Sequence, residues 1–539
     1  MTPADRLADL ETRYLAARES HDRLDVARAV GDPGATRLEP AAAEASAAVR
    51  AALDALPPSD AGRLADDDRR ALQAIRRGID AADGYRLPVV DAADDVDCGD
   101  AATWQAVITA GGEGLRDRLE TCFASVAGTI PVGGGATTTR LEVLGRLATE
   151  PDAGRRRELF LALRPLWAVV DGDGKSASPY RQLVRDTAPA WRAGRSPVAA
   201  NAAALGIGVA DVEAWVEATL QAWRTAVVEP ARAAGVPPLE PWDWWWRAGA
   251  AQRAMAGLDL AACRDLNRRV HASLGADLEA LEIQFDLEAR PGRPAVPVAF
   301  TSFGARPHRR PDGSWTTARP IVLASYRSGG LDTLAELVHE TGHAIHIAGI
   351  RTRPAFTDWP DSDALTEALA DLVALDLAEP AWQTRWLPGA TGLAEAQAIR
   401  CQYASVVLDA AWARLELQLL ADPDRRPNDV WSEITSTWLG VVPHPEWSWW
   451  AVRGQLVAEP GYMANYALGA VLSTSLRAAI RDGRGPWHAG DPGWYPWVRD
   501  RIYRFGLERP CGEVVRSVLG RAPTVEPLLA EIARAAGPA

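Results

Sequence analysis

One stretch of the sequence decides the fold, and it reads Leu334-Ala335-Glu336-Leu337-Val338-His339-Glu340-Thr341-Gly342-His343-Ala344-Ile345-His346-Ile347. It contains the pattern H-E-x-x-H, in which His339 and His343 are four residues apart. Residues with this spacing lie on one face of a helix, so both imidazole rings can bind the same metal ion. Glu340 lies one step further around the helix and can take a proton from a water at that ion. The stretch therefore predicts a helix that carries a metal site.

The residues around the motif predict that this helix is buried. Asp332 is a suitable N-cap because it follows the flexible residues Ser328-Gly329-Gly330. Apolar residues then supply a packing surface, at Leu334, Leu337, Val338, Ala344, Ile345 and Ile347. A five-residue pattern also recurs by chance in long proteins. Two ordinary histidines beside a core helix are therefore the alternative until a third ligand is found.

The following helix, predicted over residues 363–377, offers the third ligand that a catalytic zinc site requires. Glu367 and Asp371 are four residues apart and share a face of this helix. The rest of the helix is apolar, and a carboxylate on a buried helix needs a cation or a hydrogen-bond partner. We therefore predict that Glu367 completes the zinc site with His339 and His343. Asp371 then accepts a hydrogen bond from one of these histidines.

A third histidine occurs in the motif helix. His346 is seven residues, or two helical turns, after His339. We expect it to be a polar neighbour of the ligands, and we do not predict it as a ligand. An ordinary histidine with a hydrogen-bond partner on the helix surface is the alternative.

The composition limits the partners that the chain can have. Its 539 residues carry a formal net charge of -13. Nucleic acid and anionic membrane surfaces attract clustered Lys and Arg, so this charge argues against both. The start of the chain lacks the pattern of a signal peptide, and no apolar run is long enough to span a membrane. Short peptides and neutral or cationic small molecules remain open as substrates. We expect a monomer or small homo-oligomer.

The cysteines predict a reducing compartment. They are Cys98, Cys122, Cys263, Cys401 and Cys511, and no two of them form a C-x-x-C pair. An odd number of scattered cysteines is typical of reduced thiols, and it is not typical of a disulfide framework or a thiolate zinc site. Together with the missing signal pattern, this predicts a cytoplasmic protein.

Helices dominate the remaining pattern. From residue 5 to about residue 235 the sequence predicts a succession of amphipathic helices separated by Pro and Gly. The tryptophan-rich run 241–247 follows, and we expect it to pack in a core, with the lining of a substrate cleft as the alternative. Two strands are predicted directly before the metal helix, at 296–303 and 319–326. An edge strand there could pair with the backbone of an extended substrate.

Two segments together resemble a known family. The run 339–346 (HETGHAIH) and the run 367–371 (EALAD), with 28 residues from His339 to Glu367, are similar to gluzincin metallopeptidases of the thimet oligopeptidase and oligoendopeptidase F group. The E-A-x-x-D form of the second run also resembles angiotensin-converting enzyme. The segment 285–293 is similar to the segment that leads into the active-site sheet in this family.

The resemblance implies a fold and a division of the chain. The fold is mainly α-helical and bilobed, with a deep central cleft and a small β-sheet beside the active-site helix. We expect an N-terminal helical lobe over residues 1–235. A C-terminal catalytic lobe then covers residues 236–539.

The resemblance also implies a reaction, the zinc-dependent cleavage of peptide bonds in short peptides with Glu340 as general base. In the family, tyrosines in a segment comparable to residues 460–469 donate hydrogen bonds to the oxyanion of the intermediate. We expect Tyr466 in this role first and Tyr462 second. A tyrosine that only packs at the start of a helix is the alternative for each.

One departure from the family leaves the substrate open. Family members usually have a histidine a few helical turns before the tyrosine, where this chain has Gln455-Leu456-Val457. A glutamine can donate a hydrogen bond but cannot carry a proton. The alternatives are therefore a zinc-dependent amide hydrolase that acts on a specialised small-molecule metabolite and an inactive peptide-binding protein.

Overall fold

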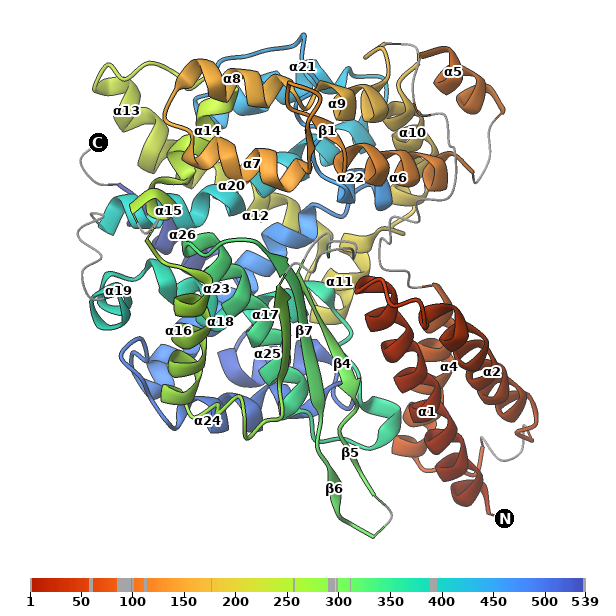
Figure 1. Ribbon diagram of the computed structural model, residues 1–539. Helices are drawn as coiled ribbons and strands as arrows, with labels where there is room; N and C mark the ends of the chain where they lie inside the picture. Colours follow the sequence, from red (N-terminus) through yellow and green to blue (C-terminus); the bar gives the residue numbers. More distant parts are fainter. Residues whose placement is uncertain are drawn as a thin grey trace. The chain divides into compact units, whose positions relative to one another are not determined.

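The structure is a computed structural model that describes residues 2–57, 62–84, 98, 101–110, 114–175, 177–254, 257–288, 296, 299–310, 312–387 and 395–536 (Figure 1). The described chain is mainly α-helical and divides into two compact units. Unit 1 comprises Met1–Val89, Gly257–Asp376 and Ile480–Gly520. Unit 2 comprises Val90–Ala256, Leu377–Ala479 and Arg521–Ala539.

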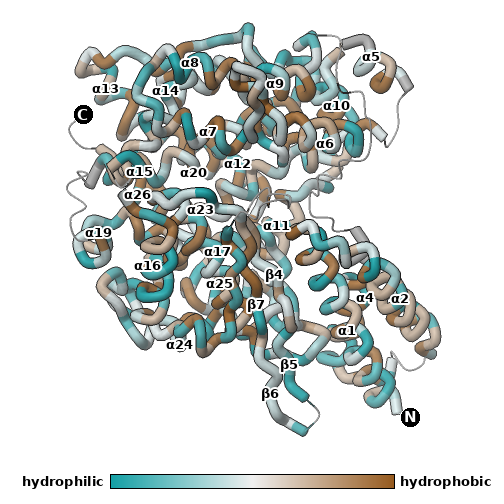
Figure 2. Tube along the Cα trace, viewed as in Figure 1, coloured by the Kyte–Doolittle hydropathy of each residue, from teal (hydrophilic) through white to brown (hydrophobic). Residues whose placement is uncertain are grey.

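Unit 1 contains the metal motif. Its longer helices are α1 (Pro3–Ala29), α2 (Ala35–Asp54), α4 (Asp66–Gly84), α16 (Leu260–Ser273), α17 (Leu331–Gly349), α18 (Asp363–Ala374), α24 (Trp494–Arg501) and α25 (Cys511–Leu519). Apolar and polar residues alternate along α1, α2 and α4, as the brown and teal parts of the tube show in Figure 2. Their apolar faces form a core with Leu7, Leu10 and Ile75, and Phe356 packs into the same core.

A buried arginine links α1 to the sheet of unit 1. The side chain of Arg306 is 2% exposed. Its Nε and Nη2 atoms donate to the two carboxylate oxygens of Asp22 at 2.6 and 2.9 Å. Its Nη1 atom lies 3.3 Å from Asp358 and donates to the carbonyl of Thr357. Every nitrogen of this cation therefore has a partner, as burial of a charge requires.

The sheet of unit 1 has three strands in the order β3-β7-β4. They are β3 (Gln284–Glu288), β4 (Phe300–Ala305) and β7 (Arg319–Tyr326), with a small pair β5 (His308–Arg309) and β6 (Trp315–Thr316) beyond them. β3 runs parallel and β4 antiparallel to β7. Both predicted strands are present, although Pro297 and Val298 lie outside the described residues. The strand directly before the metal helix is β7, so an extended substrate can pair only with the outer strands, β3 or β4.

Unit 2 is built almost entirely of helices. They are α5 (Ala101–Ala110), α6 (Gly114–Ala127), α7 (Arg140–Thr149), α8 (Ala153–Leu161), α9 (Arg164–Asp171), α10 (Pro179–Arg192), α11 (Pro197–Leu205), α12 (Val209–Trp223), α13 (Glu229–Ala233), α14 (Pro241–Ala248), α15 (Ala250–Ala254), α19 (Pro380–Trp386), α20 (Glu395–Ala421), α21 (Pro427–Ile434), α22 (Gln455–Ala458), α26 (Glu526–Ala533) and α23 (Ala464–Arg484) as far as Ala479. Two short strands, β1 (Ile130–Pro131) and β2 (Thr137–Thr138), form a hairpin. The ring of Phe160 contacts Trp242, Trp245 and Trp449, so most of the tryptophan-rich run packs in a core as predicted.

The predicted fold class is confirmed, because the described chain is mainly helical and carries a small sheet beside the metal helix. The lobes were expected to be continuous, whereas each compact unit combines three segments. The reason is packing across the sequence: α1 lies against β4, and α12 lies against α20. No helix in the described part of the chain has the length and apolar character that crossing a membrane requires.

The prediction of five reduced cysteines is wrong for one pair. Cys98 and Cys122 form a disulfide, with Cα atoms 5.6 Å apart. The other three, Cys263, Cys401 and Cys511, are not part of a disulfide. The spacing of cysteines in a sequence does not report their distance in the fold, so scattered positions could not exclude this bridge. The argument for a reducing compartment therefore has no support from this pair.

Candidate metal centre

Helix α17 begins two residues earlier than the sequence predicts. Gly330 is its N-cap and has a φ of 122°, a backbone conformation that favours glycine. No side chain caps this end of the helix. The prediction that Asp332 is the N-cap is wrong, because Asp332 lies within the first turn. Further along, Asn267 donates a hydrogen bond to the Thr341 hydroxyl at 2.9 Å, which fixes α17 against α16.

Gly342 allows α17 and α18 to approach each other closely. A Cβ atom at this position would lie 2.4 Å from the backbone oxygen of Ala370 and 2.8 Å from its Cα atom. Close-packed interiors do not tolerate such overlap, so any larger residue would force the helices apart. The glycine of the motif thereby brings Glu367 and Asp371, which lie on either side of Ala370 in α18, near the motif histidines.

The carboxylates of α18 face the histidines of α17. Glu367 Oε2 lies 3.4 Å from His339 Nε2, and Glu367 Oε1 lies 3.8 Å from His343 Nε2. The Nδ1 atom of His339 donates a hydrogen bond to Asp371 Oδ1 at 2.8 Å. The Nε2 atom of His339 is then the nitrogen left for a metal ion. The structure thus brings together the four residues that helical spacing selected.

The charges of these groups favour a cation between them. Burial opposes ionisation of Glu367, but the hydrogen bond from His339 and the nearby charge of His343 lower its pKa to about 2. Burial also opposes the charge on His339, yet the carboxylates of Asp371 and Glu367 raise the pKa of His339 well above its usual value. For His343, burial outweighs the carboxylates and lowers the pKa. The position between the three side chains therefore attracts a positive charge.

The geometry fits a zinc ion. Ligand atoms lie about 2 Å from zinc, so two ligands of a tetrahedral site are roughly 3.3 Å apart. The separations of 3.4 and 3.8 Å between Glu367 and the two histidines are close to this value. Two imidazoles and one carboxylate, with a fourth position open, are also the donor set of catalytic zinc sites. Donor atoms of His339, Glu340 and His343 all lie within 4.8 Å of one another, so Glu340 borders the same position.

Glu340 is held by a residue outside the motif. Its side chain is 6% exposed. The hydroxyl oxygen of Thr301, on β4, lies 2.7 Å from Glu340 Oε2 and 2.9 Å from the backbone carbonyl oxygen of Glu340. This contact fixes the direction of the carboxylate. Sequence reasoning missed Thr301, because it is 39 residues from Glu340 and a single threonine in a strand carries no signal of such a role.

His346 lies on the same helix in apolar surroundings. Neither of its ring nitrogens has a hydrogen-bond partner among the described residues. Its ring stacks on Tyr503 at 4.8 Å and meets Trp359 edge-on at 5.5 Å. Trp359 also contacts the ring of His343 at 5.4 Å. The predicted influence of His346 on the site stays a prediction, and Trp359 is a side chain that contacts both His346 and His343.

The two predicted tyrosines lie in unit 2, where α23 begins. The Nε2 atom of Gln455 donates a hydrogen bond to the hydroxyl oxygen of Tyr466 at 2.8 Å. The rings of Tyr462 and Tyr466 are 5.7 Å apart. Gln455 therefore contacts the tyrosine hydroxyl directly. The phenol proton of Tyr466 is not used in this contact, because the glutamine is the donor.

A buried carboxylate supports the segment before Tyr466. Glu416 on α20 accepts hydrogen bonds from the backbone N–H groups of Gly461 and Met463 at 2.8 and 2.9 Å. Arg453 adds a contact from the other side, with its guanidinium carbon 5.1 Å from the centre of the Tyr466 ring. Asp409 holds this arginine at 2.8 Å. The amide of Gln455, the carboxylate of Glu416 and the cation of Arg453 thus position the tyrosine and the segment before it.

No protein-family model and no curated protein matches this sequence. Solved structures do match, over nearly the whole chain. An M32 carboxypeptidase from Deinococcus radiodurans R1 is 15% identical with a TM-score of 0.59, over 98% of this chain and 97% of that chain. The metallocarboxypeptidase 1 of Trypanosoma cruzi is 16% identical with a TM-score of 0.52, over 98% of each chain. A structure described as an oligoendopeptidase F is 15% identical with a TM-score of 0.54, over 98% of this chain and 95% of that chain.

The chain has the fold of these helical metallopeptidases. The predicted resemblance to the oligoendopeptidase F group is confirmed at the level of the fold. Sequence reasoning did not name the M32 carboxypeptidases. The likeness of the second helix to angiotensin-converting enzyme stays a prediction.

Proposed function

We propose that the chain is a zinc-dependent hydrolase that cleaves peptide bonds in short peptides. One observation carries the proposal: His339, His343 and Glu367 converge on one position that Glu340 borders. The fold supports it, since the similar structures are by name carboxypeptidases and an oligoendopeptidase. The cytoplasm and a monomeric or small homo-oligomeric state remain expectations.

Each residue of the site has a defined task in this proposal. His339, His343 and Glu367 hold the zinc ion, and Asp371 fixes the ring of His339. A bound zinc ion would polarise the substrate carbonyl and make a nearby water more acidic. Glu340 takes the proton from that water and passes it to the leaving amine.

The remaining tasks concern position and charge. Thr301 keeps the Glu340 carboxylate in one orientation while the proton moves, since its hydroxyl lies 2.7 Å from Oε2. Tyr466, with Tyr462 as a second donor, stabilises the negative oxygen of the tetrahedral intermediate. The contact from Gln455 supports this role because it orients the hydroxyl without using the phenol proton.

The test is Glu340→Gln, which removes the base and keeps the shape of the side chain. We expect stoichiometric zinc by metal analysis and a loss of turnover of about 10²- to 10⁴-fold. Asp332→Asn is the matched control, since it removes an exposed carboxylate from the same helix. Unchanged turnover in Glu340→Gln, or wild-type protein that binds no zinc, would contradict the proposal.

The substrate class is tested on wild-type protein with a mixed peptide library beside acylated small amides. Mass spectrometry of the products reports both the class and the position of cleavage. Cleavage of peptides supports the proposal, and loss of single C-terminal residues would assign a carboxypeptidase. Cleavage of the amides with no cleavage of peptides would instead support the metabolite hydrolase. The reason to consider that alternative is that the segment Gln455-Leu456-Val457 has no histidine.

A further inference from the structure

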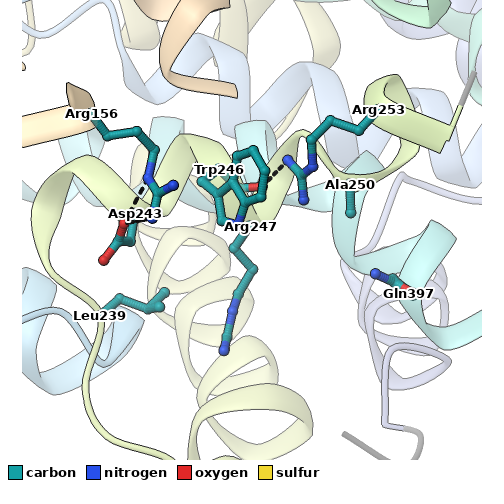
Figure 3. A pocket seen from close by; sticks show the side chains of 8 residues that line it. All are labelled: Arg156, Leu239, Asp243, Trp246, Arg247, Ala250, Arg253 and Gln397. Carbon is teal, nitrogen blue, oxygen red and sulfur yellow. Dashed lines mark hydrogen bonds and ion pairs between the residues drawn. The ribbon is translucent and has the colours of Figure 1, made fainter. Parts of the chain in front are cut away.

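Unit 2 contains a cavity of about 360 Å³ that is lined by three arginines (Figure 3). Arg156 comes from α8, Arg247 from the end of α14 and Arg253 from α15. The ring of Trp246 lies among them, as the close view shows. The only carboxylate among the residues that line this cavity is that of Asp243. The three arginines differ in how far their N–H groups are already engaged.

Arg156 is fully engaged. Its Nε and Nη2 atoms donate to Asp243 Oδ1 at 2.9 and 2.6 Å. Its Nη1 atom donates to the backbone carbonyls of Glu150 and Pro151 at 2.9 and 2.8 Å. The pair of Arg156 and Asp243 is therefore neutral as a whole, and it leaves the carboxylate unavailable to balance the other two arginines.

Arg253 is held on one side and open on the other. Its Nη1 atom donates to the carbonyls of Ala148 and Trp246, at the ends of α7 and α14. Its guanidinium carbon lies 3.4 Å from the centre of the Trp246 ring, a cation–π contact that fixes the plane of the group. Its Nε and Nη2 atoms make no hydrogen bond or ion pair with the residues that the structure describes. The open edge of this guanidinium is thus preorganised.

Arg247 has no partner at all among the described residues. Its side chain is exposed and in Figure 3 extends away from the Trp246 ring, into the space between Leu239 and Gln397. Burial, followed by the charge of Arg247, lowers the pKa of the neighbouring Arg400. By contrast, all three guanidinium nitrogens of Arg306 donate hydrogen bonds to described residues. The cavity therefore carries two unbalanced positive charges in a chain whose net charge is -13.

We propose that this cavity binds the phosphate group of a small phosphorylated metabolite. A phosphate monoester carries close to two negative charges and three acceptor oxygens in one group, so it can accept hydrogen bonds from the open edge of Arg253 and balance the positive charges of both arginines. A single carboxylate carries only one negative charge, so it balances only one of the two arginines. The volume lies within the range of small-molecule sites and exceeds the need of a phosphate ion, which leaves room for the rest of the metabolite.

The test is isothermal titration calorimetry on the full-length protein at low ionic strength, where screening is weak. Ribose 5-phosphate and inorganic phosphate are the probes, and ribose and succinate are the comparison ligands. We expect ribose 5-phosphate to bind and ribose not to bind. Arg247→Glu should weaken the binding of ribose 5-phosphate at least about tenfold, because it replaces one of the two unbalanced positive charges of the cavity with a negative charge.

Arg195→Glu is the matched control, since Arg195 is exposed in the same unit, lies outside the cavity and gives the same change of charge. It should change the affinity less than about twofold if the charge acts locally. Circular dichroism on both variants checks that the fold is intact. The titrations need no zinc and no turnover, so their outcome is separate from that of the peptidase proposal.

Four results would overturn the inference. They are no binding of either phosphate, wild-type affinity in Arg247→Glu, an equal loss in Arg195→Glu, and succinate binding as tightly as ribose 5-phosphate. Equal affinity for inorganic phosphate and ribose 5-phosphate would show that the cavity binds phosphate. It would also show that the rest of the metabolite is not recognised. Clearly tighter binding of ribose 5-phosphate would support the proposal in full.

Discussion

Helix α17 carries histidines in two different surroundings. His339 and His343 point their Nε2 atoms at the carboxylate of Glu367. His346, less than one turn after His343, is 1% exposed and has no hydrogen-bond partner on either nitrogen within the described part of the chain. Burial lowers the pKa of His346 to about 3, whereas the carboxylates raise the pKa of His339.

The difference teaches that burial alone does not make a histidine a ligand. A buried ring without a counter-charge stays neutral and acts as an aromatic packing group, as the stacking of His346 on Tyr503 illustrates. A buried ring that shares its surroundings with carboxylates needs a proton or a metal ion. The neighbours of a histidine therefore indicate its role more directly than its place in a motif.

The largest effect is expected from a test that replaces one histidine from each of the two surroundings. His343→Asn should abolish stoichiometric zinc binding and reduce turnover to the background, because two ligands remain where a catalytic site needs three. His346→Phe should keep the zinc and change turnover much less, since phenylalanine preserves the ring and removes only unpaired nitrogens. Metal analysis and initial rates measure both effects. Equal losses of zinc and turnover in the two variants would show that the surroundings of His343 and His346 do not determine their roles.

A smaller effect should follow when the carboxylate partner of His339 is weakened. Asp371→Asn keeps the size of the side chain but can no longer hold the histidine as a charged acceptor. We expect zinc affinity to fall about 10- to 100-fold, with the fold intact. Competition with a chelator measures the affinity. An unchanged affinity would mean that the 2.8 Å contact between Asp371 and His339 does not orient the ligand.

The smallest effect concerns a histidine that resembles His346. His271 is fully buried, donates its Nδ1 proton to the carbonyl of Asn267, and has a pKa that burial lowers to about 4. The unfolded chain therefore takes up a proton first as the pH falls from about 6.5 to about 4. The free energy of unfolding should decrease over this window by on the order of 3 kcal/mol.

His271→Gln isolates this contribution, because glutamine does not titrate. Chemical denaturation over a pH series should show a flatter dependence for the variant than for the wild type between about pH 6.5 and pH 4. Above this window the two curves should run parallel. Parallel curves throughout would show that the pKa of His271 is the same in the folded and unfolded states.

Much of the metal centre could be predicted because helical periodicity converts spacing into geometry. The spacing from His339 to His343 and from Glu367 to Asp371 placed each pair on one face, and the apolar residues of both helices indicated that the faces meet. The exact start of α17 could not be predicted, because it depends on the backbone conformation of Gly330.

Contacts between distant residues could not be predicted in the same way. Thr301 reaches Glu340 across 39 residues, and Arg253 reaches Ala148 across 105 residues. Strand β3 was missed although its five residues, Gln284–Glu288, alternate between polar and apolar side chains. Such contacts depend on the packing of whole elements, which local patterns do not encode.

The close approach of the α17 and α18 backbones at Gly342 fixes the space between the metal ligands on the two helices. Side chains that separate helices can change rotamer and absorb a change in spacing, but backbone atoms in direct contact cannot. An ion with longer bonds, such as calcium at about 2.3 to 2.6 Å, would have to bend α17 or α18 in order to enter. Discrimination between ions is therefore partly mechanical at this centre, since the stiffness of two helices acts beside the chemistry of the ligands.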